Sequence, residues 1–190
     1  MKLTFQSLFV TGALLLSGCD DSTSKARIAL EAQMTDPQSA QYRNEQVKPW
    51  GVVCGEANVK NYAGGYIGFT PYIAFPVGGE DWNAVVMDDK NYDYVSPICS
   101  KSPIELYKAE VLPESEKGWY VMLRAQPSYN GFLDPEDMVK LDKLGYKVIV
   151  SKAGRGYLGP FKNKESSEIV GFSMAVATAG VGWFPSEWMF

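Results

Sequence analysis

The stretch DPEDMVKLDKLG, residues 134–145, carries the clearest secondary-structure signal in the chain. Asp134 is a favoured N-cap residue, Pro135 suits the first helical position, and Gly145 suits the position after the last turn. Apolar side chains recur within the stretch at helical spacing, namely Met138, Leu141 and Leu144. The stretch therefore predicts an amphipathic helix with defined ends.

Strand patterns flank this helix on both sides. The segment that precedes it, residues 118–125, is rich in strand-forming aromatic and β-branched residues. The segments that follow it predict, in order, strands at 147–151 and 155–161, a second helix at 165–176 and a last strand at 181–184. This β-α-β-β-α-β order is that of a ferredoxin-like sheet, which has two helices on one face and an open face that a ligand can reach.

The region before this unit predicts a second mixture of helix and strands. Ala26 to Met34 has helical spacing, and Asp36-Pro37 ends the run. Strands are expected at 47–53, 66–75, 84–87 and 92–96. In 66–75 the alternation predicts a core face of Ile67, Phe69, Ile73 and Phe75. An aromatic surface is expected from Tyr62, Tyr66, Tyr72 and Trp82. The predicted fold class of the whole chain is α+β.

The first nineteen residues predict where in the cell the protein is located. Lys2 is followed by a short apolar run and then by Leu15-Leu16-Ser17-Gly18-Cys19. This stretch resembles the lipobox of bacterial lipoproteins. The resemblance implies that residues 1–18 are a signal peptide, that Cys19 is lipidated, and that the mature chain is anchored to a membrane in the cell envelope. Asp20 resembles the retention signal of inner-membrane lipoproteins, which favours the periplasmic face of that membrane. Residues 19–25 are small and polar and are expected to form a tether.

The two other cysteines predict a cross-link. Once Cys19 is assigned to lipid, Cys54 and Cys99 remain as a pair, and an oxidising periplasm favours a disulfide between them. Such a bridge would stabilise the region by roughly 3 to 4 kcal/mol through loop closure. The alternative is two buried free thiols.

The composition excludes several function classes. The chain has 22 acidic and 18 basic residues and a formal net charge of −4, so it offers nucleic acid no electrostatic attraction. It has no histidine, which removes the commonest general base and metal ligand.

The glycines of 154–159 match a dinucleotide fingerprint, but Pro160 follows at once. The calcium-loop-like segment at Asp89 lacks the required glycine and glutamate. We therefore expect no enzyme activity, no cofactor and no metal.

A second motif lies in the N-terminal region. The segment CGEANVKNYAGGYIGF, residues 54–69, together with Asp36-Pro37 and Ala40 to Arg43, resembles a segment of small uncharacterised bacterial and phage-associated proteins, and this implies no known activity. Its polar residues Glu56, Asn58, Lys60 and Asn61 could line a polar ligand site. The alternative is that they cap a turn and face water.

A third resemblance concerns the C-terminal unit. Trp119-Tyr120-Val121-x-Leu123, then Tyr157-Leu158-Gly159-Pro160-Phe161 and an acid-bearing helix, resemble the SPOR domain of cell-division and envelope proteins. This resemblance implies binding of peptidoglycan glycan strands on the open sheet face. The candidate contact residues, at alternate strand positions, are Arg124, Gln126, Arg155 and Tyr157.

These signals combine into one hypothesis and one rival. The first is a non-enzymatic lipoprotein with a disulfide-clipped region at 26–99, a connection at 100–117, a SPOR-like domain at 118–184 that binds peptidoglycan, and a tail at 185–190. The rival is a lipid-tethered protein of the immunity or phage-exclusion type, which binds an envelope or incoming protein through the aromatic surface and binds no glycan.

Overall fold

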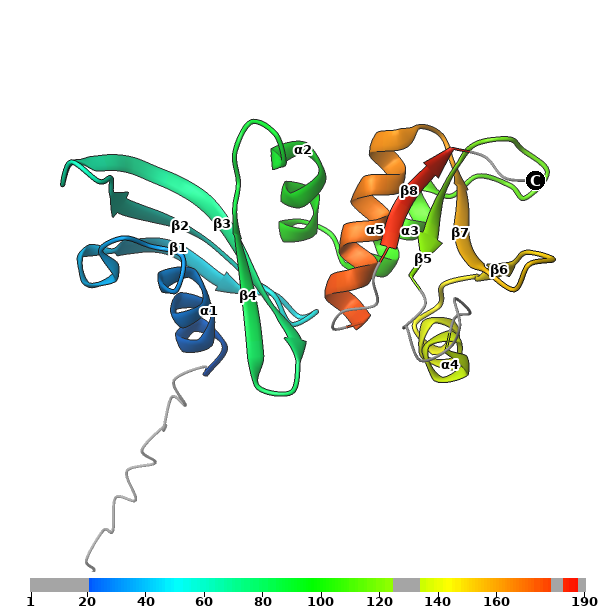
Figure 1. Ribbon diagram of the computed structural model, residues 1–190, viewed down its shortest axis with the longest axis horizontal. Coiled ribbons are helices and arrows are strands. Elements are labelled where there is room, and N and C mark those ends of the chain that lie inside the picture. Colours follow the sequence, from blue (N-terminus) through cyan, green and yellow to red (C-terminus); the bar gives the residue numbers. More distant parts are fainter. Residues whose placement is uncertain (1–20, 125–133, 179–182, 188–190) are drawn as a thin grey trace, which may run out of the picture.

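The computed structural model describes residues 21–124, 134–178 and 183–187, and these form two antiparallel sheets with helices around them (Figure 1). Each sheet has four strands. The predicted α+β class is confirmed. Among the sequence-based predictions, the signal peptide, Cys19 and Gln126 lie outside the described residues.

The first sheet is a meander of four consecutive strands. They are β1 (Gln41–Val47), β2 (Val53–Lys60), β3 (Tyr66–Gly78) and β4 (Asp81–Val86), in the order β1-β2-β3-β4. Helix α1 (Asp21–Glu31) covers one face, and a 3-10 turn, η1 (Pro37–Ser39), leads into β1. Ala26 and Leu30 of α1 are fully buried against Tyr72 and Ala74 of β3.

Helix α1 begins earlier than the sequence pattern predicted. The expected tether, 19–25, overlaps the helix from Asp21 onward. Asp21 lies in the first turn, where the helix dipole favours an acidic side chain, and it forms a 2.8 Å ion pair with Lys25 one turn later. Residues 21–25 are therefore helical rather than a free linker.

The segment expected as a strand at 92–96 is helical instead. It forms α2 (Tyr92–Val95) and the 3-10 helix η2 (Ser96–Cys99). The Asp88 side chain accepts hydrogen bonds from the backbone N–H groups of Lys90 and Asn91, which turns the chain after β4. Pro97 then stands in the first turn of η2, where a missing N–H costs nothing.

Strand β3 does not have one buried and one exposed face. Tyr72, Ile73, Ala74 and Phe75 are all buried, because α1 covers one face while α2, η2 and helix α5 (Lys164–Thr178) cover the other. The prediction that Tyr72 lies on the surface is wrong, since its exposed fraction is 0%. The prediction that Ile67 belongs to the core is also wrong, because this residue precedes the covered part of the strand and is 59% exposed.

The second sheet has the predicted β-α-β-β-α-β order. Its elements are β5 (Trp119–Leu123), α4 (Pro135–Lys143), β6 (Ile149–Val150), β7 (Gly156–Phe161), α5 and β8 (Trp183–Glu187). The strand order is β6-β7-β5-β8, with every neighbouring pair antiparallel. The Asp134 carboxylate accepts a hydrogen bond from the Glu136 N–H at 2.8 Å, as its N-cap role predicts. Strand β8 extends to Glu187, into the segment expected as a tail.

The connection at 100–117 is packed rather than extended. It contains helix α3 (Pro103–Glu110), which begins with a capping box between Ser102 and Glu105. Leu106 joins the core beside the first sheet, and Tyr107 joins the core of the second. In Figure 1, α5 lies between the two sheets, and α3 contacts α5. No helix among the described residues is both long and apolar enough for a membrane span.

Candidate functional site

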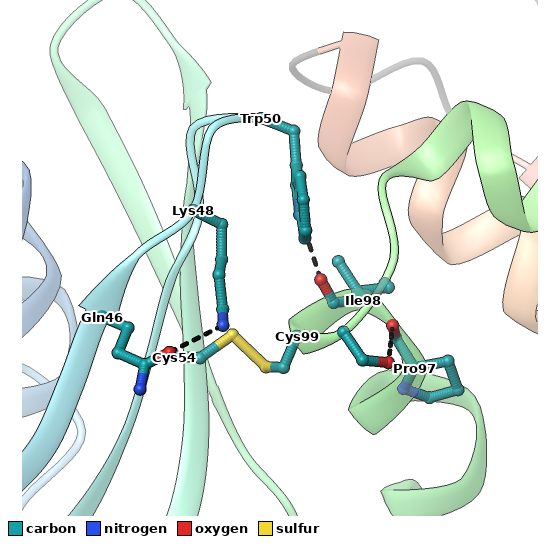
Figure 2. The surroundings of a disulfide bond; sticks show 8 residues. Gln46, Lys48, Trp50, Cys54, Pro97, Ile98 and Cys99 are labelled. Atoms are coloured by element: carbon teal, nitrogen blue, oxygen red, sulfur yellow. Dashed lines mark hydrogen bonds between the residues drawn. A yellow bond between two sulfur atoms is a disulfide. The ribbon is translucent and has the colours of Figure 1, made fainter.

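The disulfide joins the first sheet to the helical segment that follows it. Cys54 of β2 and Cys99 of η2 are bonded, with their Cα atoms 5.9 Å apart (Figure 2). Beside this bond the Trp50 indole Nε1–H donates to the Ile98 carbonyl at 3.0 Å. On the other side of the same segment, Phe172 of α5 contacts Tyr94 edge to face, with ring centroids 6.0 Å apart. The predicted pairing is confirmed, and it fixes the segment that contacts α5.

The face of the second sheet that points away from the helices follows from the strand register. Tyr157 of β7 pairs with Met122 of β5 on one side and with Ile149 of β6 on the other, so these three side chains share a face. Their neighbours Val121 and Leu158 point the other way, into the helix-covered core. The face away from the helices is therefore a band of apolar and aromatic side chains.

Two tyrosines on this face are nearly covered. Tyr120 and Tyr157 stack edge to face, with centroids 6.4 Å apart and planes at 84°. The exposed fraction is 6% for Tyr120 and 1% for Tyr157. Tyr157 is therefore almost completely covered and offers a ligand little surface.

A groove of about 750 Å³ lies at the β6–β7 hairpin, and its lining includes Ile149 and Tyr157 of this face. Ser151 and Arg155 close the hairpin: the Ser151 N–H donates to the Arg155 carbonyl at 2.9 Å, and the Ser151 hydroxyl accepts from the Arg155 N–H at 3.2 Å. Gly154 has a φ of +77°, which this tight turn requires. The residues that line the groove are Ile149, Val150, Ser151, Lys152, Ala153, Arg155 and Tyr157.

The groove brings together two of the four candidate glycan contacts, Arg155 and Tyr157. Arg155 is exposed at its rim. Arg124 is also exposed, one residue after β5, and strand alternation sets it on the side of Met122. Sequence reasoning missed Ser151 and Lys152, although the Ser-Lys-Ala-Gly turn between two strand patterns was a signal that the hairpin loop borders this face.

The polar residues of the N-terminal motif form hydrogen bonds and ion pairs in and beside the β2–β3 hairpin. The Asn61 side-chain oxygen accepts from the N–H groups of Ala63 and Gly65, and the Asn58 oxygen accepts from Gly68 N–H at 2.9 Å. Glu56 accepts from Arg43 of β1 at 3.0 Å, and Lys60 forms a 3.6 Å ion pair with Asp36. These contacts fit the turn-capping interpretation of the motif.

The predicted aromatic surface is smaller than expected. Tyr62 is 95% exposed at the tip of the β2–β3 hairpin, and Tyr66 is 47% exposed. Trp82 is half-buried beside the core that contains Tyr72. Next to Tyr62, a groove of about 310 Å³ runs between α1 and the sheet, with the exposed Ile67 and Val86 on its wall.

The Glu45 carboxylate in the first sheet is largely shielded from solvent and accepts hydrogen bonds from its neighbours. The side chain of Glu45, 10% exposed, accepts from Arg27 of α1 and from the Tyr72 hydroxyl at 2.6 Å. Burial alone would raise the pKa of this carboxyl, but the hydrogen bonds from Arg27 and Tyr72 outweigh it and hold the pKa below the ordinary value of 4.5. Burial, together with the hydrogen bond to Glu45, raises the pKa of the Tyr72 hydroxyl. This network is structural in character, because its members satisfy one another.

The strand order and element order of the second sheet define a ferredoxin-like α+β unit, joined through α3 to a four-stranded meander. No protein-family model, curated protein or solved structure matches the chain.

Proposed function

We propose that this chain is a lipid-anchored envelope protein that binds peptidoglycan glycan strands at the β6–β7 hairpin of its ferredoxin-like sheet. The anchor is supported by the Leu15-Leu16-Ser17-Gly18-Cys19 stretch and its lipobox resemblance. The Cys54–Cys99 bond supports an oxidising compartment, because disulfides persist outside the cytosol. Both lines of support favour the periplasmic side of the envelope.

The glycan proposal is carried by one observation, the groove that brings Arg155 and Tyr157 together beside the β6–β7 hairpin. Sugar rings have apolar faces rimmed by hydroxyl and acetamido groups. Ile149 and the exposed Val150 supply apolar contact, while Arg155 and Lys152 supply hydrogen-bond donors for the rim. The resemblance of residues 118–184 to SPOR domains supports the same ligand class.

Binding to purified sacculi tests this proposal. We expect retention of the protein on sacculi to increase after amidase treatment, which strips stem peptides from the glycan. Replacing Arg155 by alanine should weaken retention about tenfold, because a charge-assisted hydrogen bond contributes about 1.5 kcal/mol. Lys101→Ala, an exposed cation remote from the groove in the chain, is the matched control and should bind as the native protein does. Equal failure to bind treated and untreated sacculi would contradict the proposal.

The nearly complete exposure of Tyr62 favours a second candidate function, binding of a protein partner. Tyrosine is enriched at protein interfaces, and Asn61 and the hairpin glycines hold this one on a shaped turn. A photo-crosslinking residue at position 62 is expected to capture a discrete envelope or incoming protein in cells, whereas the same residue at the exposed Lys90 should not. Identical products from both positions would argue against a specific partner.

A further inference from the structure

Almost no free chain separates the proposed lipid from the folded body, because helix α1 begins at Asp21. Cys19 precedes Asp21, the first residue of α1, by two positions. Two residues span at most about 7 Å when fully extended. Whatever fixes α1 to the sheet therefore also fixes the folded body relative to the lipid-bearing residue.

Charged and aromatic contacts fix α1 to the first sheet. The Arg27 Nε donates to both carboxylate oxygens of Glu45 in β1, at 3.0 and 3.1 Å, and its guanidinium lies 4.8 Å from the ring centroid of Tyr42. The Tyr42 hydroxyl in turn donates to Glu31 at the end of α1 at 2.9 Å. Ala26, fully buried, completes the contact between helix and sheet. Helix and sheet thus move as one body.

The start of α1 lies beside the turn between β3 and β4. Lys25 forms a 2.6 Å ion pair with Glu80 in this turn. Farther along the helix axis, the Gln33 side chain donates to the Ala84 carbonyl at 2.9 Å, so the helix follows β4 away from the turn. Figure 1 shows the start of α1 and the β3–β4 turn at the same lower side of the first sheet.

The β2–β3 hairpin lies at the other end of β3. The strand has 13 residues, which corresponds to about 40 Å at the usual rise of a strand. Its first residue, Tyr66, belongs to the hairpin that exposes Tyr62, and its last, Gly78, belongs to the turn beside α1. The long strand therefore separates the two ends of the sheet.

We infer that the lipid anchor holds the molecule in one orientation, with the β3–β4 turn against the bilayer surface and the β2–β3 hairpin with Tyr62 directed away from it. This inference rests on the proposed lipid anchor and adds the surface that meets the membrane. The contact surface carries three carboxylates, Asp21, Glu80 and Asp81, against one cation, Lys25, and this acidic balance fits zwitterionic headgroups rather than anionic ones.

Lipid-dependent quenching tests this orientation. The full lipidated chain, purified from membranes, is labelled with a fluorophore at Asp81→Cys or at Tyr62→Cys, and mass spectrometry checks the lipid. Each protein is reconstituted into phosphatidylethanolamine-rich vesicles that contain a headgroup-linked quencher. We expect strong quenching at position 81 and none at position 62. Equal quenching at both positions, or a chain that carries no lipid, would overturn the inference.

A variant with a longer linker before α1 supplies a control, because the insertion leaves every contact of α1 intact. A flexible insert of about twenty Gly and Ser residues after Asp20 adds an average reach of about 25 Å. The insert should abolish most of the quenching at position 81, and unchanged quenching would also overturn the inference. Failure of the sacculus assay alone would leave this result intact, so the glycan and orientation proposals fail separately.

Discussion

Removal of the Cys54–Cys99 disulfide is expected to lower the free energy of unfolding by about 4 kcal/mol in the loop-entropy description. The cysteines are 45 residues apart, so the bond excludes many conformations of the unfolded chain. The closed loop contains β3, β4 and α2. Because Val95 and Ile98 beside the bond are fully buried, the segment it fixes also contributes to the core shared with α5.

Urea unfolding of the native protein and of the Cys54→Ala/Cys99→Ala variant measures this effect. A thiol reductant should lower the stability of the native protein to the level of the double variant and leave the variant unchanged. A decrease of less than about 1 kcal/mol in both cases would mean that packing alone, and not loop closure, holds η2 against the sheet.

Local signals predicted those elements whose ends are encoded by their own residues. Helix α4 is the clearest case, since the cap at Asp134 and the φ of +91° at Gly145 are local features that tertiary packing does not need to supply. The strands around it followed from their apolar and aromatic composition, and the β-α-β-β-α-β order then predicted the sheet.

The errors arose where tertiary packing or a distant side chain decides. Tyr72 alternates as a surface residue would, but α1 covers that face of β3, and Glu45 accepts a hydrogen bond from the Tyr72 hydroxyl. Ile67 alternates with the core residues of β3, but it lies before the part of the strand that the helices cover. Residues 92–96 have strand composition, and the turn at Asp88 together with Pro97 makes them helical. The residues that decide these positions lie elsewhere in the chain, so the periodicity of one segment does not reveal them.

The candidate site was predicted only as a face of a sheet. Alternation predicted that Arg155 and Tyr157 share one side, and both residues line the groove, although Arg155 precedes the first residue of β7. The burial of Tyr157 and the inclusion of Ser151 and Lys152 in the groove depend on where other segments are placed in three dimensions. A sequence pattern contains no information on that placement.

Replacing Glu45 by alanine is expected to destabilise the protein by about 2–3 kcal/mol, because it leaves Arg27 and the buried Tyr72 hydroxyl without their shared acceptor. The matched control is Glu56→Ala. Glu56 also pairs with an arginine through two hydrogen bonds in the same sheet, but its partner Arg43 is half-exposed, so the loss of stability should be much smaller than for Glu45→Ala. Equal losses for the two variants, measured by urea unfolding at neutral pH, would contradict the assigned role of Glu45.

The pH dependence distinguishes the charge of Glu45 from its shape. Since its pKa in the folded protein is held below 4.5, the carboxylate stabilises the fold fully above that pH, and the contribution is lost as the pH falls through the folded-state pKa. Glu45→Gln keeps an acceptor for Tyr72 but removes the charge that faces Arg27. The stability difference between the native protein and Glu45→Gln is therefore expected to be constant near neutrality and to shrink below about pH 4. A difference that persists unchanged into strong acid would show that the side chain stabilises α1 through packing rather than through its charge.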